Sequence, residues 1–275
     1  MLSSLSSGLS GLDNFQEQMN VIGNNIANIN TTGFKDGEVS FADTFCNTVQ
    51  GGSSTIPAMQ VGTGVEITAT GSNWSQGSLT TTGVASNLAV SGAGFFTVVD
   101  PTTGSSYVTQ DGSFTVNSTG QLVTANGDIV QGYNSSSLST IGNLTLNITG
   151  STSTSPISSY AINKQGQITV TQSDGTNFVC GQVLLQNFQD PNMLTNVGNN
   201  LYSNTANAGP TTPTAVAPGS NGLGTIESGE LEGSNVDLST EMTNLITAQR
   251  AFEANSKIIT TSNELLQTVV NLQQG

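Results

Sequence analysis

The amino-acid sequence predicts an α+β fold, in which a discontinuous, coiled-coil-like pair of terminal helices carries an antiparallel all-β body. Three features of the sequence predict this fold. Apolar residues recur every three or four positions at both ends of the chain, short runs in the middle alternate between apolar and polar residues, and turn-forming pairs separate those runs. The expected order of elements is therefore helix, β body, helix.

The N-terminal segment carries a single apolar stripe with helical spacing. Steps of three and four residues place all of its members on one face of an α-helix, and a β-strand does not give that spacing. The stripe consists of Leu5, Leu9, Leu12, Phe15, Met19, Ile22, Ile26 and Ile29. The pattern stops at residues 30–33, where Gly33 permits the positive φ of a helix exit.

The C-terminal segment carries a matching stripe with a seven-residue repeat, flanked by further apolar residues. The repeat and its flanks are Leu238, Leu245, Phe252, Ile259 and Leu266, with Met242, Ala248 and Val269 beside them. Asn235 or Asp237 is placed to cap a helix that we expect to run from about Leu238 to Leu272. Because each stripe alone is marginal in water, we expect the two helices to pair with each other; the alternative is two helices packed on a common core.

The middle of the chain, from about Val61 to Tyr202, has the pattern of short β-strands rich in threonine and valine. Three turn-forming pairs are hairpin signals, at residues 111–112, 126–127 and 174–175. Turns at such short intervals favour an antiparallel sandwich or barrel. The Ser/Thr-rich residues 134–159 are expected to form a short insertion or a long loop within the β body.

These patterns divide the chain into three parts. Residues 1–30 and 236–275 together form the expected domain of terminal helices, residues 31–75 form a connecting segment, and residues 76–235 form a β-rich outer body. Since the two ends of the body continue into paired helices, many copies could contribute their helices to a shared tube.

The composition excludes several classes of function. The chain has 4 basic residues, 18 acidic residues and no histidine, for a net charge of -14. Without histidine there is no histidine relay and no His-ligated metal. So few cations cannot neutralise a nucleic-acid backbone, and the negative charge opposes binding to an anionic membrane surface. We therefore expect no enzyme activity, no cofactor and no metal site.

The sequence also predicts no membrane span and no cleaved signal peptide, and its two cysteines are isolated. No apolar run approaches the roughly 20 residues of a membrane span. The N-terminus lacks the basic and long apolar regions of a cleaved signal peptide. Cys46 and Cys180 are isolated in sequence, and we expect two free thiols, mostly buried, with one disulfide as the alternative.

Several blocks of sequence, in order along the chain, carry a resemblance to one family. Residues 20–28, followed by Thr31–Lys35, resemble the N-terminal signature of bacterial flagellar axial proteins of the hook and rod. Further blocks resemble that family at residues 40–45, 61–65, 75–79, 88–96, 107–114, 229–237 and 245–257. In the block 107–114, Gln110 stands where the family pattern usually has arginine. The resemblance covers about the first 130 residues and the last 95.

The resemblance implies a structural protein that polymerises through its terminal helices into a helical tube, which transmits torque and lets exported subunits pass along its lumen. It implies a homo-polymer whose other partners are neighbouring axial and junction proteins, the flagellar export apparatus and the hook cap, with no nucleic acid and no membrane insertion. The expected location is the flagellar hook or basal-body rod, reached by type III export without a cleaved signal peptide.

Within the family, the resemblance points to a short hook-type subunit, with a distal rod subunit as the alternative. Residues 37–43 and the block that begins at Glu230 look most like the hook type. Hook subunits usually carry a large extra β domain, whereas only residues 134–159 stand in that place here. The segment 46–60 is also longer than the corresponding part of many hook proteins, and in this respect it resembles the rod type. In the family, the hook is a flexible joint and the rod a stiff shaft.

The candidate subunit-interface residues lie on the two terminal helices. They are Leu5, Leu9, Leu12, Phe15, Met19, Ile22, Asn24, Asn25, Ile26, Asn28, Leu238, Met242, Leu245, Arg250, Phe252, Ile259 and Leu266. The three asparagines either set the register of a subunit contact or lie on a solvated helix face. Arg250, the only arginine, either pairs with a carboxylate of another element or subunit or is exposed.

The connecting segment offers three further candidates. Gly33 is expected in a left-handed turn, with Phe34 and Lys35 docking on a neighbouring subunit; the alternative is a helix stop with an incidental aromatic residue. The acidic residues at 227, 230, 232 and 237 have no assigned role. Two remote alternatives to the axial protein are a secreted β-rich adhesin and a carbohydrate-binding module, in which Trp74 could contact sugar, but neither explains the helical ends.

Overall fold

A computed structural model of the chain describes residues 2–51, 59–135, 138, 140–146, 157–203 and 205–273. The chain forms two compact units. The helical unit comprises Met1–Ile29, Asp36–Asn73 and Val236–Gly275, and the β unit comprises Asn30–Lys35 and Trp74–Asn235. The α+β fold predicted from the sequence is confirmed, with a helix at each end of the chain and an antiparallel β body between them.

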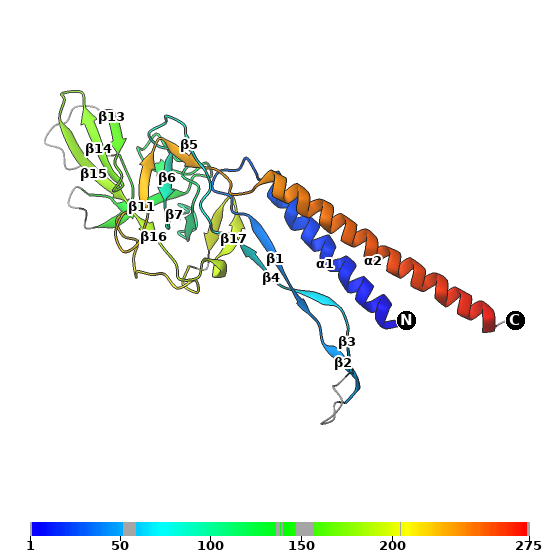
Figure 1. Cartoon of the computed structure of the whole chain (residues 1–275). Helices are drawn as coiled ribbons and strands as arrows, with labels where there is room; N and C mark the ends of the chain where they lie inside the picture. The colour runs from blue at the N-terminus through cyan, green and yellow to red at the C-terminus, as the bar shows by residue number, and fades with distance from the viewer. Residues whose placement is uncertain are drawn as a thin grey trace. The chain divides into compact units, whose positions relative to one another are not determined.

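The helical unit is built on α1, Leu2–Ala27, and α2, Leu238–Gln273. Figure 1 shows the two helices side by side. They run antiparallel, because Gly8 of α1 faces Ile259 while Asn25, further along α1, bonds to Glu241 at the start of α2. The predicted pairing of the two helices is therefore confirmed.

Two local signals fix the start of α2 and the end of α1. Asp237 caps α2, since its Oδ1 accepts a hydrogen bond from the N–H of Thr240 at 2.9 Å. At the end of α1 the N–H of Asn28 is shared between the carbonyls of Asn24 and Asn25, and the chain turns away. Asp237 is one of the two capping residues that the sequence suggested.

A twisted β ribbon completes the helical unit. Strands β1, Gly37–Asp43, and β4, Val65–Ser72, pair with each other, and β2, Cys46–Gln50, pairs with β3, Met59–Gly62. Figure 1 shows the second pair as the continuation of the first. The sequence placed the first strand only near residue 61, whereas the first strand begins at Gly37.

The β unit contains the remaining strands, and every strand pair in the described residues is antiparallel. Its strands are β5, Leu79–Thr81; β6, Leu88–Ser91; β7, Phe95–Val99; β8, Ser106–Thr109; β9, Thr115–Val116; β10, Leu122–Val123; β11, Ile129–Tyr133; β12, Ile141–Asn143; β13, Ile157–Ile162; β14, Gln167–Gln172; β15, Asn177–Val183; β16, Leu185–Gln186; β17, Thr195–Gly198; β18, Leu201–Ser203; β19, Thr225–Ser228; and β20, Glu230–Glu232. A short 3₁₀ turn, η1, spans Pro191–Met193.

One large sheet dominates the β unit, in the order β13-β14-β15-β11-β7-β8-β18-β17. Two separate pairs, β19 with β6 and β20 with β5, join the end of the β unit to its beginning. The main core lies between these strands and includes the fully buried Leu88, Phe96, Val98, Val130 and Ile226. Buried and partly exposed residues alternate along the strands that form this core; in β14, every second residue is buried.

The three hairpin signals of the sequence have different outcomes. Residues 126–127 connect β10 to β11, and residues 174–175 connect β14 to β15, as predicted. Residues 111–112 do not form a hairpin, because β8 pairs with β7 and β18, and β9 pairs with β10. Asp111 instead accepts hydrogen bonds from Thr32 and from the N–H of Ser113. Of residues 134–159, those that the structure describes include β12 and the start of β13.

Candidate functional site

The inner face of the helix pair is closely packed. Ile22 of α1 is 4% exposed, and Ala248 and Ser262 of α2 are 2% and 7% exposed. Small residues allow this approach: a Cβ added to Gly8 would lie 3.3 Å from Cγ1 of Ile259. The heptad pattern of α2 therefore places Leu245, Phe252, Ile259 and Leu266 toward α1, where they are half-buried.

The other faces of α2 carry many large apolar side chains in water. We call this set the outer apolar face of α2. It consists of Met242, Ile246, Leu265, Val269, Val270 and Leu272, with exposed fractions between 44% and 77%. Single exposed apolar residues are ordinary, but so many on one helix leave unburied surface of the kind that subunit contacts cover. This face is the candidate assembly site.

A buried amide ties the helix pair to the root of the β ribbon. Asn25 is 1% exposed, and its Nδ2 donates to Oδ1 of Asp36 at 2.5 Å and to the carbonyl of Gly37 at 2.9 Å. Nδ2 also lies 3.3 Å from Oε2 of Glu241, and the Asn25 oxygen accepts from the N–H of Gly37 at 3.0 Å. Asn25 thus joins α1, β1 and α2 within one chain.

Asp36 and Glu241 share that amide, and burial and neighbouring charges change the acidity of Asp36. Burial, together with the nearby charges of Glu241 and Glu38, raises the pKa of Asp36 to about 6, against the opposing effect of the hydrogen bond from Asn25. A pocket of about 290 Å³, lined by these carboxylates and by Gln18 and Asn244, opens beside them.

The stability of the helical unit is expected to fall as pH rises from about 4 to 6. The folded unit holds a proton on Asp36 in this window, whereas the unfolded chain, with an ordinary pKa of 3.8, has released it. Asp36→Asn should remove this dependence and stabilise the unit by about 1 kcal/mol at pH 7.5, a value reduced for solvent screening at a partly exposed site.

Helix melting followed by circular dichroism at pH 5 and pH 7.5 measures this effect. Asp13→Asn is the matched control, because Asp13 is an exposed carboxylate of α1. A wild-type chain with the same melting midpoint at both pH values would contradict the assignment.

A second polar centre lies in the β unit and involves the segment after α1. The Nζ of Lys35 donates to Oε1 of Glu232 at 2.8 Å and to the carbonyl of Ser75 at 2.9 Å. The two charged side chains are 2% and 3% exposed. Oε1 of Glu232 also accepts from the N–H of Gly77. This buried ion pair connects the strand before α2 to the segment that follows α1.

Gly33 is required by the same segment. It has φ +66°, and a Cβ added there would lie 2.8 Å from the backbone nitrogen of Asp111. Its N–H donates to the carbonyl of Glu232 at 2.8 Å. Both the left-handed backbone and the close approach therefore favour glycine, and the expected left-handed turn is present.

The β2–β3 end of the ribbon exposes apolar side chains that sequence patterns did not single out. Phe45 is 93% exposed, Met59 56% and Val61 43%. An isolated two-stranded ribbon is only marginally stable in water. This segment is a second candidate contact surface, and the only sequence signal for it was the length of the segment 46–60.

The structure separates the sequence-predicted interface residues by burial. Buried are Ile22, Asn25, Gly33 and Lys35. Half-buried are Leu5, Leu12, Phe15, Met19, Ile26, Asn28, Phe34, Leu245, Phe252, Ile259 and Leu266. Exposed are Leu9, Asn24, Leu238, Met242 and Arg250.

Two of these residues differ from their expected surroundings. The side chains of Asn25 and Lys35 are engaged inside the chain, because partners distant in sequence, Glu241 and Glu232, reach them. Arg250 is exposed, and no carboxylate of the described residues lies within ion-pair distance of it.

The acidic residues before α2 have separate roles. Glu232 is in the buried ion pair, Glu227 forms an exposed ion pair with Lys164 at 2.7 Å, and Asp237 caps α2. Both cysteines are free; Cys180 is buried, as expected, but Cys46 is exposed, because it lies on the ribbon.

No group of three or more metal-binding side chains is assembled in the part of the chain that the structure describes. Over the same residues, neither helix combines sufficient length with the apolar character needed to cross a membrane.

Three family models match separate parts of the chain. The model described as "Flagella basal body rod protein" matches residues 5–35, the "Flagellar hook protein FlgE/F/G D1 domain" matches residues 89–170, and the "Flagellar basal body rod FlgEFG protein C-terminal" matches residues 227–272. The first and last of these matches fall on the two helices and their flanks.

Curated relatives match over the whole length. The flagellar basal-body rod protein FlgG of Bacillus subtilis is 39% identical over 282 aligned positions, which cover 100% of both chains. FlgG of Borreliella burgdorferi is 33% identical, again over 100% of both chains. The flagellar hook protein FlgE of that same organism is 41% identical, but over 48% of this chain and 31% of its own length. The chain therefore belongs to the FlgE/F/G family of flagellar hook and basal-body rod proteins.

Proposed function

We propose that the chain is an axial structural subunit of the flagellum, which polymerises through its two terminal helices into a helical tube. The observation that carries the proposal is the outer apolar face of α2. The heptad stripe from Leu245 to Leu266 already packs against α1, whereas these apolar side chains stay exposed in the single chain and can be buried by other subunits. Burial of about half of such a side chain contributes roughly 1 kcal/mol, and the contact repeats with every subunit.

The parts of the chain have different roles in this tube. The terminal helices, residues 1–30 and 236–275, line it; residues 31–75 connect them to the body; and residues 76–235 form the outer layer. Torque passes through the repeated contacts, and exported subunits pass along the lumen. The role is structural rather than catalytic, and it needs no cofactor.

The rod type is favoured over the hook type by the extent of similarity. Relatives named FlgG align with this chain from end to end, whereas the hook protein of Borreliella burgdorferi aligns with about half of it. The long ribbon that includes β2 and β3 also agrees with the rod type. The hook type remains the second candidate, since several sequence blocks and the higher local identity over 140 positions support it.

The proposed partners are copies of this chain, neighbouring axial and junction proteins, the flagellar export apparatus and, for the hook type, the hook cap. A basal-body or hook location follows from this assignment.

Labelling of isolated hook–basal bodies tests the assignment. An epitope inserted in the exposed turn at residues 101–104, between β7 and β8, should leave the strands unchanged. We expect immunogold label on the rod. Label along the hook would select the second candidate, and absence of label from both structures, in a motile strain that expresses the tagged chain, would refute the axial assignment.

A further inference from the structure

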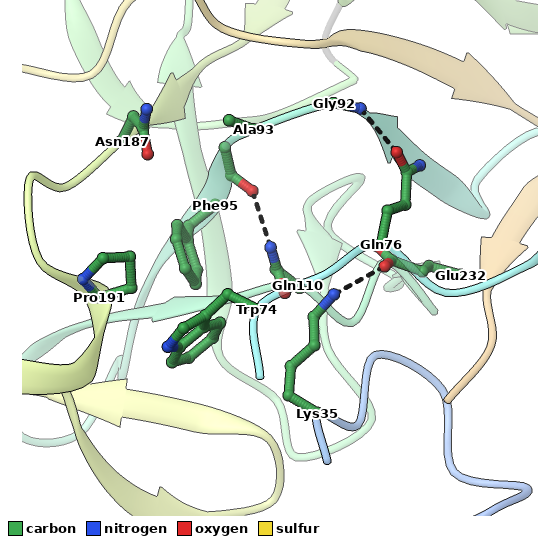
Figure 2. Close-up of a pocket in the computed structure, with 11 residues that line it drawn as sticks. Lys35, Trp74, Gln76, Gly92, Ala93, Phe95, Gln110, Asn187, Pro191 and Glu232 are labelled. Atoms are coloured by element: carbon green, nitrogen blue, oxygen red, sulfur yellow. Dashed lines mark hydrogen bonds and ion pairs between the residues drawn. The ribbon is translucent and has the colours of Figure 1, made fainter. Parts of the chain in front are cut away.

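The β unit contains a cavity of about 280 Å³ that the proposed assembly does not use. Trp74, Phe95 and Pro191 form an apolar wall, and Gln110, Lys35 and Glu232 form a polar one. Figure 2 shows the Gln110 amide between Phe95 and Trp74 on one side and Lys35 on the other. All of these residues belong to the β unit.

The polar wall presents one buried acceptor without a donor. Gln110 is 7% exposed; its Nε2 faces the carbonyl of Gly94 at 3.5 Å, and its Oε1 has no hydrogen-bond partner. The Gly94 carbonyl fixes the orientation of the amide, because only the nitrogen can donate to it. Beside it, Oε1 of Glu232 accepts from Nζ of Lys35 and from the N–H of Gly77, so the same wall also carries a carboxylate. A buried acceptor without a donor is costly, so a donor-rich ligand would gain from entering.

The apolar wall offers an aromatic surface. The Trp74 ring meets Phe95 at 5.3 Å between centroids and Tyr202 at 5.1 Å, both edge-on, and these contacts fix its orientation. Its indole N–H already donates to Oδ1 of Asn192 at 3.2 Å. The ring therefore offers the cavity its π system rather than a donor.

We propose that this cavity binds a guanidinium group. A guanidinium is flat, stacks on an indole, and carries five N–H donors and no acceptor, which matches an aromatic wall beside the unpaired oxygen of Gln110 and the carboxylate of Glu232. The ion pair of Lys35 with Glu232 is internally neutral, and the chain as a whole carries a charge of -14, which favours a cation over a neutral or anionic ligand.

The guanidinium could come from a free small molecule or from an arginine side chain of a second copy. The chain has a single arginine, Arg250, which is exposed and makes no ion pair within the described residues. The second source rests on the proposed polymerisation, whereas the first does not.

Titration of the monomeric full chain with arginine amide tests the cavity directly. Trp74 is the only tryptophan, so its fluorescence reports on this site alone. We expect a saturable change in emission. Citrulline amide, in which an uncharged urea replaces the guanidinium, should bind at least tenfold more weakly. Equal responses to the two compounds, or no saturable response to arginine amide, would overturn the proposal.

Variants of Gln110 test whether arginine amide binds at this side chain. Gln110→Met keeps the size of the side chain but removes the acceptor, and should weaken arginine amide by about tenfold or more. Gln110→Arg should place its own guanidinium in the cavity, so that the free variant emits like the ligand-saturated wild type and no longer responds to the probe. Gln165→Met, at an exposed position of the same unit, is the matched control and should titrate like wild type. Unchanged binding by Gln110→Met would overturn the assignment of Gln110.

A second arm distinguishes the two sources. Arg250→Lys should leave the binding of arginine amide by the monomer unchanged. If Arg250 of a second copy fills the cavity, wild-type polymers should lose the response to arginine amide and Arg250→Lys polymers should regain it. A response retained by wild-type polymers would exclude Arg250 as the occupant and leave a free guanidinium compound as the ligand.

Discussion

Lys35→Met is expected to lower the free energy of unfolding of the β unit by about 3–5 kcal/mol. The substitution leaves the carboxylate of Glu232, which is 3% exposed, without its counter-ion in an interior that solvates charge poorly. It also removes a donor from the carbonyl of Ser75. Denaturant unfolding followed by Trp74 fluorescence measures the loss, because this tryptophan lies in the β unit.

Two further variants test whether this loss of stability comes from a buried, unpaired charge. Lys164→Met breaks the other ion pair of the described residues, whose side chains are 68% and 27% exposed, and should cost no more than about 1 kcal/mol. Lys35→Met combined with Glu232→Gln removes both charges and keeps an acceptor for the N–H of Gly77, so it should recover most of the stability. A double variant no more stable than Lys35→Met alone would contradict this explanation.

The sequence predicted the helices well because their signals are local. An apolar stripe and a capping carboxylate at Asp237 lie within one helix, so periodicity was sufficient to place α2 from Leu238 to within one residue of its observed end. The pairs at 126–127 and 174–175 were equally local, since a two-residue turn joins neighbouring strands.

The polar centres could not be predicted because their partners are distant in sequence. Lys35 meets Glu232, and Asn25 meets Glu241, only after the ends of the chain have come together. The same reason explains Asp111, whose bond to Thr32 comes from the segment after α1 and replaces the expected hairpin. The acidic residues near position 232 were the one sequence feature that pointed to the buried ion pair. The sequence did not indicate that Lys35 pairs with one of them.

The candidate assembly site was predicted in part. The heptad repeat correctly placed apolar residues on α2, but a repeat does not tell which side faces α1 and which faces other subunits. The structure divides them, with Leu245 and Phe252 toward the inner side and residues such as Leu265 and Val269 outside. This division makes it possible to separate folding from assembly by substitution.

Substitution of Leu265, Val269 and Leu272 together by glutamine is expected to abolish polymerisation and motility while the monomer keeps its helical content. The three side chains are 58%, 44% and 77% exposed, so their loss costs the single chain little. In a tube, the same change places three amides in every subunit contact without matched partners, at about 1–3 kcal/mol each. Complementation of a deletion strain, together with circular dichroism of the purified variant, measures both effects.

The control must change exposed residues of the same stretch that are not apolar. Substitution of Thr260, Glu264 and Gln267 together by alanine meets this condition, since all three are exposed. It should retain motility because no apolar contact is lost. If the glutamine variant swims as well as this control, the outer apolar face of α2 does not hold the subunits together, and the contacts must lie elsewhere, with the exposed Phe45 of the ribbon as the next position to test. If both variants fail and the monomer has lost its helical content, folding rather than assembly has been disturbed, and the outer face has an unexpected role within the single chain.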